Sequence, residues 1–251
     1  MNGRLLLTEI RHLPRTGLGI WLGALSVAGP VCFAALAAER HRPLPGANAT
    51  AQPLQLAATL AGCGIGICAA LLLGTPIVTD AYRRGTAALA FLAAKRRAFV
   101  VLAQIAAVAL YSAVLGAFAG WLCVAATAVV GPGTEIADPA ELQLISDVSL
   151  VYAAAGGSAA AVGHLVRRPV AAVGCVVAYL AFGELVSSRL PYAGGHLAPR
   201  MPLHSAWGFV IEGRRPPVPT PYWAAPLSLL LVTLAFTSAA VVVTELRDIE
   251  P

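Results

Sequence analysis

Long runs of apolar residues alternate along the chain with short clusters of charged residues and prolines, and this pattern dominates the sequence. A helix that crosses a lipid bilayer needs about 20 mostly uncharged residues. Six intervals between the charge clusters reach that length. The predicted spans cover residues 17–38, 54–78, 99–130, 148–166, 170–188 and 222–243. The pattern therefore predicts an all-α integral membrane protein with six transmembrane helices, folded as a single transmembrane domain over residues 1–251.

Composition also places the chain in lipid. Of its 251 residues, 58% are hydrophobic and only 12% are charged, whereas soluble domains carry about 25% charged residues. So few charges cannot cover a water-exposed surface, while a bundle of apolar helices leaves its outer face against acyl chains. The five cysteines all lie inside apolar runs, so neither a disulfide framework nor a zinc site is expected.

The positions of the basic residues predict the orientation of the spans. A net charge of +5 would suggest nucleic acid as a partner of a soluble chain, but in a membrane protein Arg and Lys mark the cytoplasmic loops. With both termini in the cytoplasm, eleven basic residues lie inside and six outside. The inner ones are Arg4, Arg11, Arg15, Arg83, Arg84, Lys95, Arg96, Arg97, Arg167, Arg168 and Arg247. We therefore expect a multi-pass protein of the cell membrane, with both termini cytoplasmic and no nucleic-acid partner.

The segment 1–14 has the pattern of an amphipathic helix. Arg4, Arg11 and Arg15 recur on one helical face, and leucine and isoleucine occupy the opposite face. Such a helix lies along the inner leaflet with its arginines near the phosphates of membrane lipids. Pro14 marks the bend into the first span. An elbow helix is therefore predicted here; the alternative is a positively charged flank of the first span.

The link between the second and third spans, residues 79–98, is more than a tether. Basic clusters bracket a short helix-forming stretch, and Gly85 followed by Thr86 predicts a break and an N-cap at its start. The apolar residues expected to face the cytosol are Leu89, Phe91 and Leu92. Exposed apolar groups rimmed by charge are typical of a docking surface. The alternative is a helix that folds back onto the membrane.

This link resembles the first coupling segment of ABC-2 type permeases, the membrane subunits of a class of ABC transporters. Those segments carry an acid, an aromatic residue, basic residues, Gly-Thr, a leucine-bearing helix and a basic pair before the third span. The matching residues are Asp80, Tyr82, Arg83, Arg84, Gly85, Thr86, Leu89, Leu92, Arg96 and Arg97. Family members usually have Glu directly before the aromatic residue, whereas this chain has Ala81 there. The elbow, the six spans, the long loop before the last span and a short charged tail extend the resemblance over nearly the whole chain.

The resemblance implies the permease half of an ATP-driven ABC exporter. Two such chains, identical or homologous, would form a path lined mainly by spans two and five. Each would dock through its cytoplasmic coupling helix on a separate ATPase subunit, which binds ATP and Mg²⁺. The cargo would be hydrophobic or amphipathic and would move outward. The outer loop, residues 189–221, would form short re-entrant helices that cap the exit.

No catalytic site and no cofactor is predicted within this chain. An ATPase needs a Gly-x-x-x-x-Gly-Lys-Ser/Thr loop, and the single lysine, Lys95, has no glycine near it. His196 and His204 flank Arg200, but a third metal ligand at a suitable spacing is missing. Two alternatives come from other classes of protein. One is a non-transporting immunity or sensor protein. The other is a secondary transporter, which is disfavoured because the spans contain few buried ionisable residues for proton or sodium coupling.

Glu184 is the one acid predicted inside a span. An ionisable residue within the membrane suggests a gate or a cargo path. The structural alternative is a carboxylate near the interface that pairs with Arg189 or reaches a lipid headgroup. Both interpretations of Glu184 remain open at this point.

Glycines spaced four apart are the candidates for close helix contacts. Small residues at this spacing allow two helix backbones to approach closely. The pairs are Gly19 with Gly23, Gly62 with Gly66, and Gly116 with Gly120. The alternative is that they simply reflect a composition rich in Ala and Gly.

Overall fold

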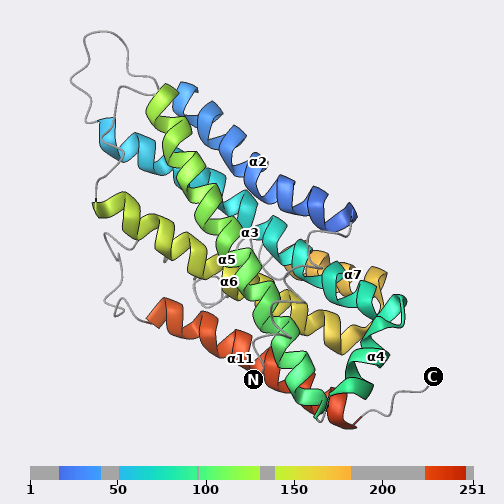
Figure 1. Cartoon of the computed structure of the whole chain (residues 1–251). Helices are drawn as coiled ribbons and strands as arrows, with labels where there is room; N and C mark the ends of the chain where they lie inside the picture. Colours follow the sequence, from blue (N-terminus) through green and yellow to red (C-terminus); the bar gives the residue numbers. More distant parts are fainter. Residues whose placement is uncertain (1–16, 41–50, 95, 131–138, 182–223, 247–251) are drawn as a thin grey trace.

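The computed structural model describes residues 17–40, 51–94, 96–130, 139–181 and 224–246, and all regular structure in these ranges is helical (Figure 1). The helices are α2 Gly17–Arg40, α3 Ala51–Arg83, α4 Thr86–Ala93, α5 Arg97–Val130, α6 Pro139–Val166, α7 Pro169–Ala178 and α11 Ala224–Leu246. Five of them, α2, α3, α5, α6 and α11, contain stretches long and apolar enough to cross a membrane. The expected all-α fold is confirmed for these residues, and the five apolar helices support a multi-pass membrane protein.

Of the predicted span 170–188, the structure describes residues 170–181, and these are helical. α7 begins at Pro169, at the position where a missing N–H group costs a helix nothing. A wider π turn carries it from Ala178 to Ala181. The sixth crossing therefore stays a prediction. Several further predictions fall outside the described residues: the elbow 1–14 with Arg4, Arg11 and Arg15, residues 182–188 with Glu184, and the outer loop 189–221.

Two predicted helix boundaries are wrong. α3 continues past residue 78 to Arg83, because Asp80 pairs with Arg83 and Arg84 about one turn later and so stabilises a further turn. The link to α5 is correspondingly shorter than predicted. α6 begins at Pro139 instead of residue 148. Acidic residues are favoured in the first turns of a helix, and Glu141 lies in the first turn of α6.

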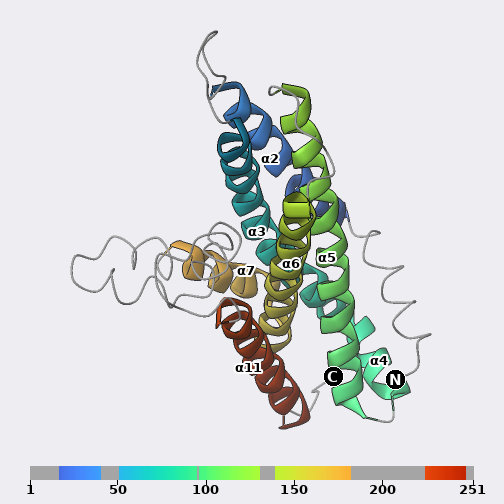
Figure 2. The same cartoon turned by 90° about the vertical axis from the view of Figure 1, so that its left-hand side faces the viewer.

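The long helices pack as a bundle with α3, α5 and α6 at its centre (Figures 1 and 2). α2 packs along α3 and α5, and α11 lies against α6 and α5. α7 projects sideways from the bundle and contacts α3 and α6 (Figure 2). α5 has 34 residues and is therefore about 51 Å long, which exceeds the roughly 30 Å of a hydrocarbon core. A helix of this length is long enough for its ends to reach the headgroup region on both sides of a bilayer.

Tyr152 on α6 is the largest fully buried side chain of the described core. Its ring lies between Gly66 of α3 and Gly116 of α5, where a Cβ atom would stand 1.5 Å from Tyr152 Oη and 2.7 Å from Tyr152 Cγ, respectively. Its hydroxyl donates to the Ser26 carbonyl of α2 at 3.2 Å. Gly120 packs similarly closely against Ile145 of α6. The close contacts predicted for Gly66, Gly116 and Gly120 are confirmed, and Tyr152 joins four helices.

One end of the bundle gathers the basic residues that the structure describes outside α2. The carboxyl ends of α3 and α6 lie there with the amino end of α5, and Thr244 near the end of α11 approaches the same place. The arginines of this end are Arg83, Arg84, Arg96, Arg97, Arg167 and Arg168. Residues that are separate in the sequence thus gather at one end of the bundle, called below the arginine end. The short helix α4 lies within it.

Candidate functional site

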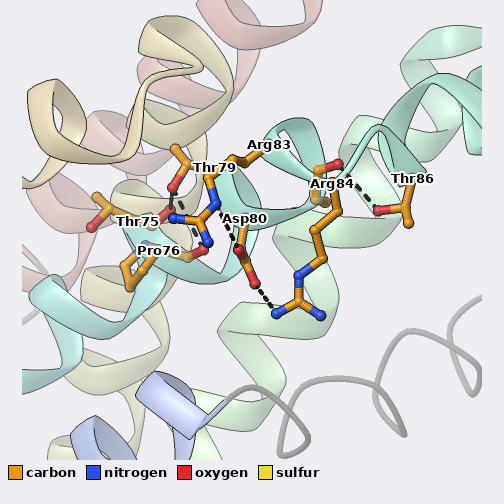
Figure 3. A network of polar contacts seen from close by, with 8 residues as sticks. Thr75, Pro76, Thr79, Asp80, Arg83, Arg84 and Thr86 are labelled. Atoms are coloured by element: carbon orange, nitrogen blue, oxygen red, sulfur yellow. Dashed lines mark hydrogen bonds and ion pairs between the residues drawn. The ribbon is translucent and has the colours of Figure 1, made fainter.

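Helix α4 is held apart from α3 by a tight turn at Gly85. Gly85 has a left-handed backbone with φ 72°, which a residue with a Cβ adopts only with strain. The Gly85 N–H donates to the Tyr82 carbonyl at 3.2 Å and so closes the turn. Gly85, not Thr86, occupies the N-cap position; the Thr86 hydroxyl instead donates back to the Ala81 carbonyl at 3.1 Å (Figure 3). The predicted break is confirmed, and the predicted threonine cap is wrong.

The two faces of α4 have opposite environments. Leu89 and Leu92 are 67% and 84% exposed, whereas Ala87 and Phe91 are 3% and 6% exposed. Positions 87 and 91 are four apart and share one face of a helix, while positions 89 and 92 are three apart and share another. The exposure predicted for Leu89 and Leu92 is confirmed. The exposure predicted for Phe91 is wrong, because its face of α4 packs into a cluster with Val78 of α3 and Val101 of α5.

Asp80 and its two neighbouring arginines form the polar side of the α3–α4 turn. Figure 3 shows both guanidinium groups turned toward the Asp80 carboxylate. Arg84 Nη2 donates to Asp80 Oδ2, and Arg83 Nε lies 3.8 Å from Asp80 Oδ1. The arginine side chains are 73% and 59% exposed, so each pair contributes at most about 1 kcal/mol. One carboxylate between two arginines leaves a net positive surface beside α4.

Tyr82 points into the bundle instead of toward the surface. Its hydroxyl lies 2.9 Å from His164 Nδ1 of α6, and the two rings meet edge to face at 5.7 Å. Phe91 of α4 lies against the Tyr82 ring at a centroid distance of 6.3 Å. The Arg167 guanidinium stands 5.4 Å from the centre of that ring, and Thr244 of α11 is close enough to interact with the hydroxyl. These five residues, the Tyr82 cluster, connect α4 to α3, α6 and α11.

Arg167 turns the chain from α6 into α7. Its φ of 58° is left-handed, a conformation that costs a non-glycine residue about 1 kcal/mol or more. Its N–H closes the last turn of α6 by donating to the Gly163 carbonyl at 2.9 Å. Its Nε and Nη2 atoms, like Nε2 of His164, are buried and have no hydrogen-bond partner among the described residues. The aromatic ring of Tyr82 supplies a cation–π contact to this guanidinium group.

Only part of this site follows from the sequence. The matching residues from Asp80 to Leu92 do lie around one helix, but Asp80 is paired internally and Tyr82 and Phe91 are directed inward. His164 and Thr244 were missed. The available signal was a histidine three residues before an arginine in the otherwise uncharged second half of α6. No three His, Cys, Asp or Glu side chains gather as metal ligands within the described part of the chain.

Contacts run from α4 into the bundle. Phe91 of α4 lies against the Tyr82 ring, and the Tyr82 hydroxyl lies close to His164 of α6 and Thr244 of α11. A close-packed interior of this kind leaves little free space between the side chains. No protein-family model matches the chain, and no curated protein matches its sequence. The geometry of these residues is therefore the basis for any functional assignment.

Replacing Tyr82 by Phe is expected to lower the free energy of unfolding by about 1 to 3 kcal/mol, because His164 Nδ1 would lose its partner in a buried place. Unfolding in mixed detergent micelles measures this change. Tyr111→Phe is the matched control, since the Tyr111 hydroxyl makes no hydrogen bond to a described residue; a change within about 0.5 kcal/mol is expected there. In a His164→Leu background the cost of Tyr82→Phe is expected to shrink by at least about 0.5 kcal/mol. Equal costs in the two backgrounds would contradict a direct bond.

Proposed function

We propose that this chain is the membrane-spanning permease subunit of an ATP-driven ABC exporter and that α4 is its contact with a separate ATPase subunit. The observation that carries the proposal is the two-faced character of α4. One face is anchored in the bundle through Ala87 and Phe91, and the other presents Leu89 and Leu92. A short helix fixed on one side and apolar on its exposed side is suited to transmit a force from a bound partner.

The surroundings of α4 support the same function. Arg83, Arg84 and Arg96 are exposed and flank α4 in the sequence. Their positive charge would orient an acidic partner and speed its association, while the two leucines supply the apolar contact. Because the surrounding end of the bundle is basic, an acidic rim around the partner's apolar pocket is the complementary surface. Headgroups of membrane lipids are a second acidic ligand for arginines at this end.

The mechanism follows from the connections of α4. ATP and Mg²⁺ bind in the partner, where closure of two ATPase subunits moves the docked helix. The Tyr82 cluster passes that displacement to α6 and α11, and two permease chains, identical or homologous, change from inward-open to outward-open. A hydrophobic or amphipathic cargo leaves on the outer side. The free energy that drives this conformational change comes from the ATPase subunit, since this chain carries no phosphate-binding loop.

The side of the membrane on which α4 lies tests this function directly. In an otherwise cysteine-free chain, Leu92→Cys is expected to react with a membrane-impermeant maleimide only from the cytoplasmic side. Val129→Cys is the matched control, because both positions are 84% exposed and they lie toward opposite ends of the bundle. Ala87 is unsuited to this assay because it is buried. Labelling of Leu92→Cys from outside intact cells would place α4 beyond the reach of any ATP-binding subunit and overturn the proposal.

A further inference from the structure

An apolar cavity lies in the side of the bundle, between α3, α6, α7 and α11. Its volume is about 350 Å³, within the range of roughly 300 to 1,000 Å³ of small-molecule sites. Each of the four helices contributes to its walls. Representative residues are Ile67 and Leu71 of α3, Val151 of α6, Cys175 of α7, and Val232 and Phe236 of α11. The cavity is distinct from the Tyr82 cluster and shares no residue with it.

The described walls offer almost nothing to a polar ligand. No charged side chain is among them. The walls contain two hydroxyl-bearing residues, Tyr179 next to α7 and Ser158 of α6, and Ser158 is bonded to Thr233 of α11 at 3.0 Å. Thr233 in turn donates to the Leu229 carbonyl at 2.9 Å. A water molecule in a cavity needs two to four polar partners, and apolar cavities of this kind bind apolar molecules instead. The chemistry therefore selects hydrocarbon as the occupant.

The arrangement of the helices gives hydrocarbon a route into the cavity. α7 packs against α3 and α6, whereas α11 packs against α6 and α5, and the two helices scarcely contact each other. α11 is also the most exposed of the five long helices, with 17% of its apolar stretch buried. Figure 2 shows α7 leaving the bundle sideways above α11. The described walls are therefore least closed between α7 and α11, next to the most exposed of the apolar helices.

We infer that this cavity binds one flexible hydrocarbon chain, supplied by a membrane lipid or by the tail of an amphipathic molecule. Binding requires only the walls described above and no ATPase. The further role of the cavity as a site for the exporter's cargo rests on the proposed function. A chain anchored here would contact α3 and α6 at the centre of the bundle while its polar head stays at the membrane boundary.

Photolabelling of the full chain in lipid nanodiscs tests this inference. The probes are palmitate with a diazirine on its chain and phosphatidylcholine carrying the same chain. Label is expected on wall residues such as Phe236 and Val232, and excess unlabelled palmitate or lipid is expected to suppress it. Labelling by palmitate alone identifies the tail of an amphipathic molecule as the occupant. Labelling by phosphatidylcholine alone identifies a membrane lipid. Labelling by both probes identifies a site that accepts a hydrocarbon chain from either source. Label spread evenly over the outer faces of the helices would overturn the inference.

A matched pair of tryptophan substitutions separates the cavity from the neighbouring lipid surface. Val232→Trp fills the cavity from α11. It is expected to reduce labelling about tenfold or more, since each methylene displaced from an apolar site weakens binding about fourfold. Leu231→Trp lies on the same helix, 57% exposed and away from the cavity, and is expected to change labelling by less than about twofold. Equal labelling of the two variants would contradict a cavity site.

The unmodified chain provides a second measurement that does not depend on folding of a variant. Cys175 lines the cavity and Cys32 lies exposed on α2, and both are free thiols. Palmitate is expected to slow alkylation of Cys175 and leave the rate at Cys32 unchanged. Parallel rates at the two cysteines would overturn the inference. If no ATPase couples to the chain but palmitate still slows alkylation of Cys175, the cargo role is excluded and the hydrocarbon-binding site remains. The two proposals therefore fail separately.

Discussion

Replacing Leu89 and Leu92 together by aspartate is expected to release the ATPase subunit and abolish stimulated ATP hydrolysis while the bundle stays folded. Both side chains are exposed and make no contribution to the described core. Burying one leucine in an interface contributes about 1.5 to 3 kcal/mol. Losing two therefore weakens binding by at least about a hundredfold, and desolvation of two carboxylates adds to the loss.

The measurement is copurification of an ATPase chain with the tagged permease, followed by Mg²⁺-dependent ATP hydrolysis of the complex. Leu246→Asp is the matched control, because Leu246 is a 78% exposed leucine at the end of α11, outside α4. That variant is expected to retain the ATPase. Unchanged hydrolysis in the double variant would exclude α4 as the docking helix. Release of a partner that hydrolyses no ATP would favour the non-transporting sensor over the exporter.

The second large effect is expected for Gly66→Ala, which should remove most of the folded protein. A Cβ at this position would stand 1.5 Å from Tyr152 Oη and 2.7 Å from the side chain of Pro30. Gly116 packs closely at the base of the same side chain, next to Tyr152 Cβ, Cγ and Cδ1, which restricts the room in which the ring can shift. Overpacking of a core costs about 1 to 3 kcal/mol or more. Displacement of the ring also breaks its bond to the Ser26 carbonyl, which costs about 1 kcal/mol.

Fluorescence-detected size exclusion and the midpoint of thermal unfolding measure this prediction. Gly174→Ala on α7 is the matched control, because a Cβ there would meet nothing within 4 Å. Gly29→Ala on α2 is a second control, with an ordinary contact of 3.5 Å to Ile65. Both controls are expected to elute as the unmodified chain does. If Gly66→Ala unfolds at the same temperature as Gly174→Ala, the close packing of Tyr152 between α3 and α5 is wrong.

Helix positions and the exposed face of α4 were accessible from the sequence because they depend on local properties. Runs without charge predict helices in lipid whatever their neighbours are, and five of the predicted spans correspond to helices of suitable length. The Gly85 break followed from the conformational freedom of one residue. Helix ends were predicted less well. The ends of α3 and α6 depend on side chains such as Asp80, whose arginine partners are fixed only once the helix extends.

The sequence alone determined a membrane bundle, the grouping of arginines in its short links, and Leu89 and Leu92 as exposed apolar residues. Tertiary structure decided which other residues of the candidate site face inward. Phe91 was expected at the surface because nothing local distinguishes it from Leu92, yet it packs against α5, and Tyr82 meets His164, 82 residues away. The apolar cavity likewise exists only where four helices meet. An apolar side chain is equally suited to contact lipid or the protein interior. Whether it contacts one or the other is therefore determined by the packing of a distant helix against it.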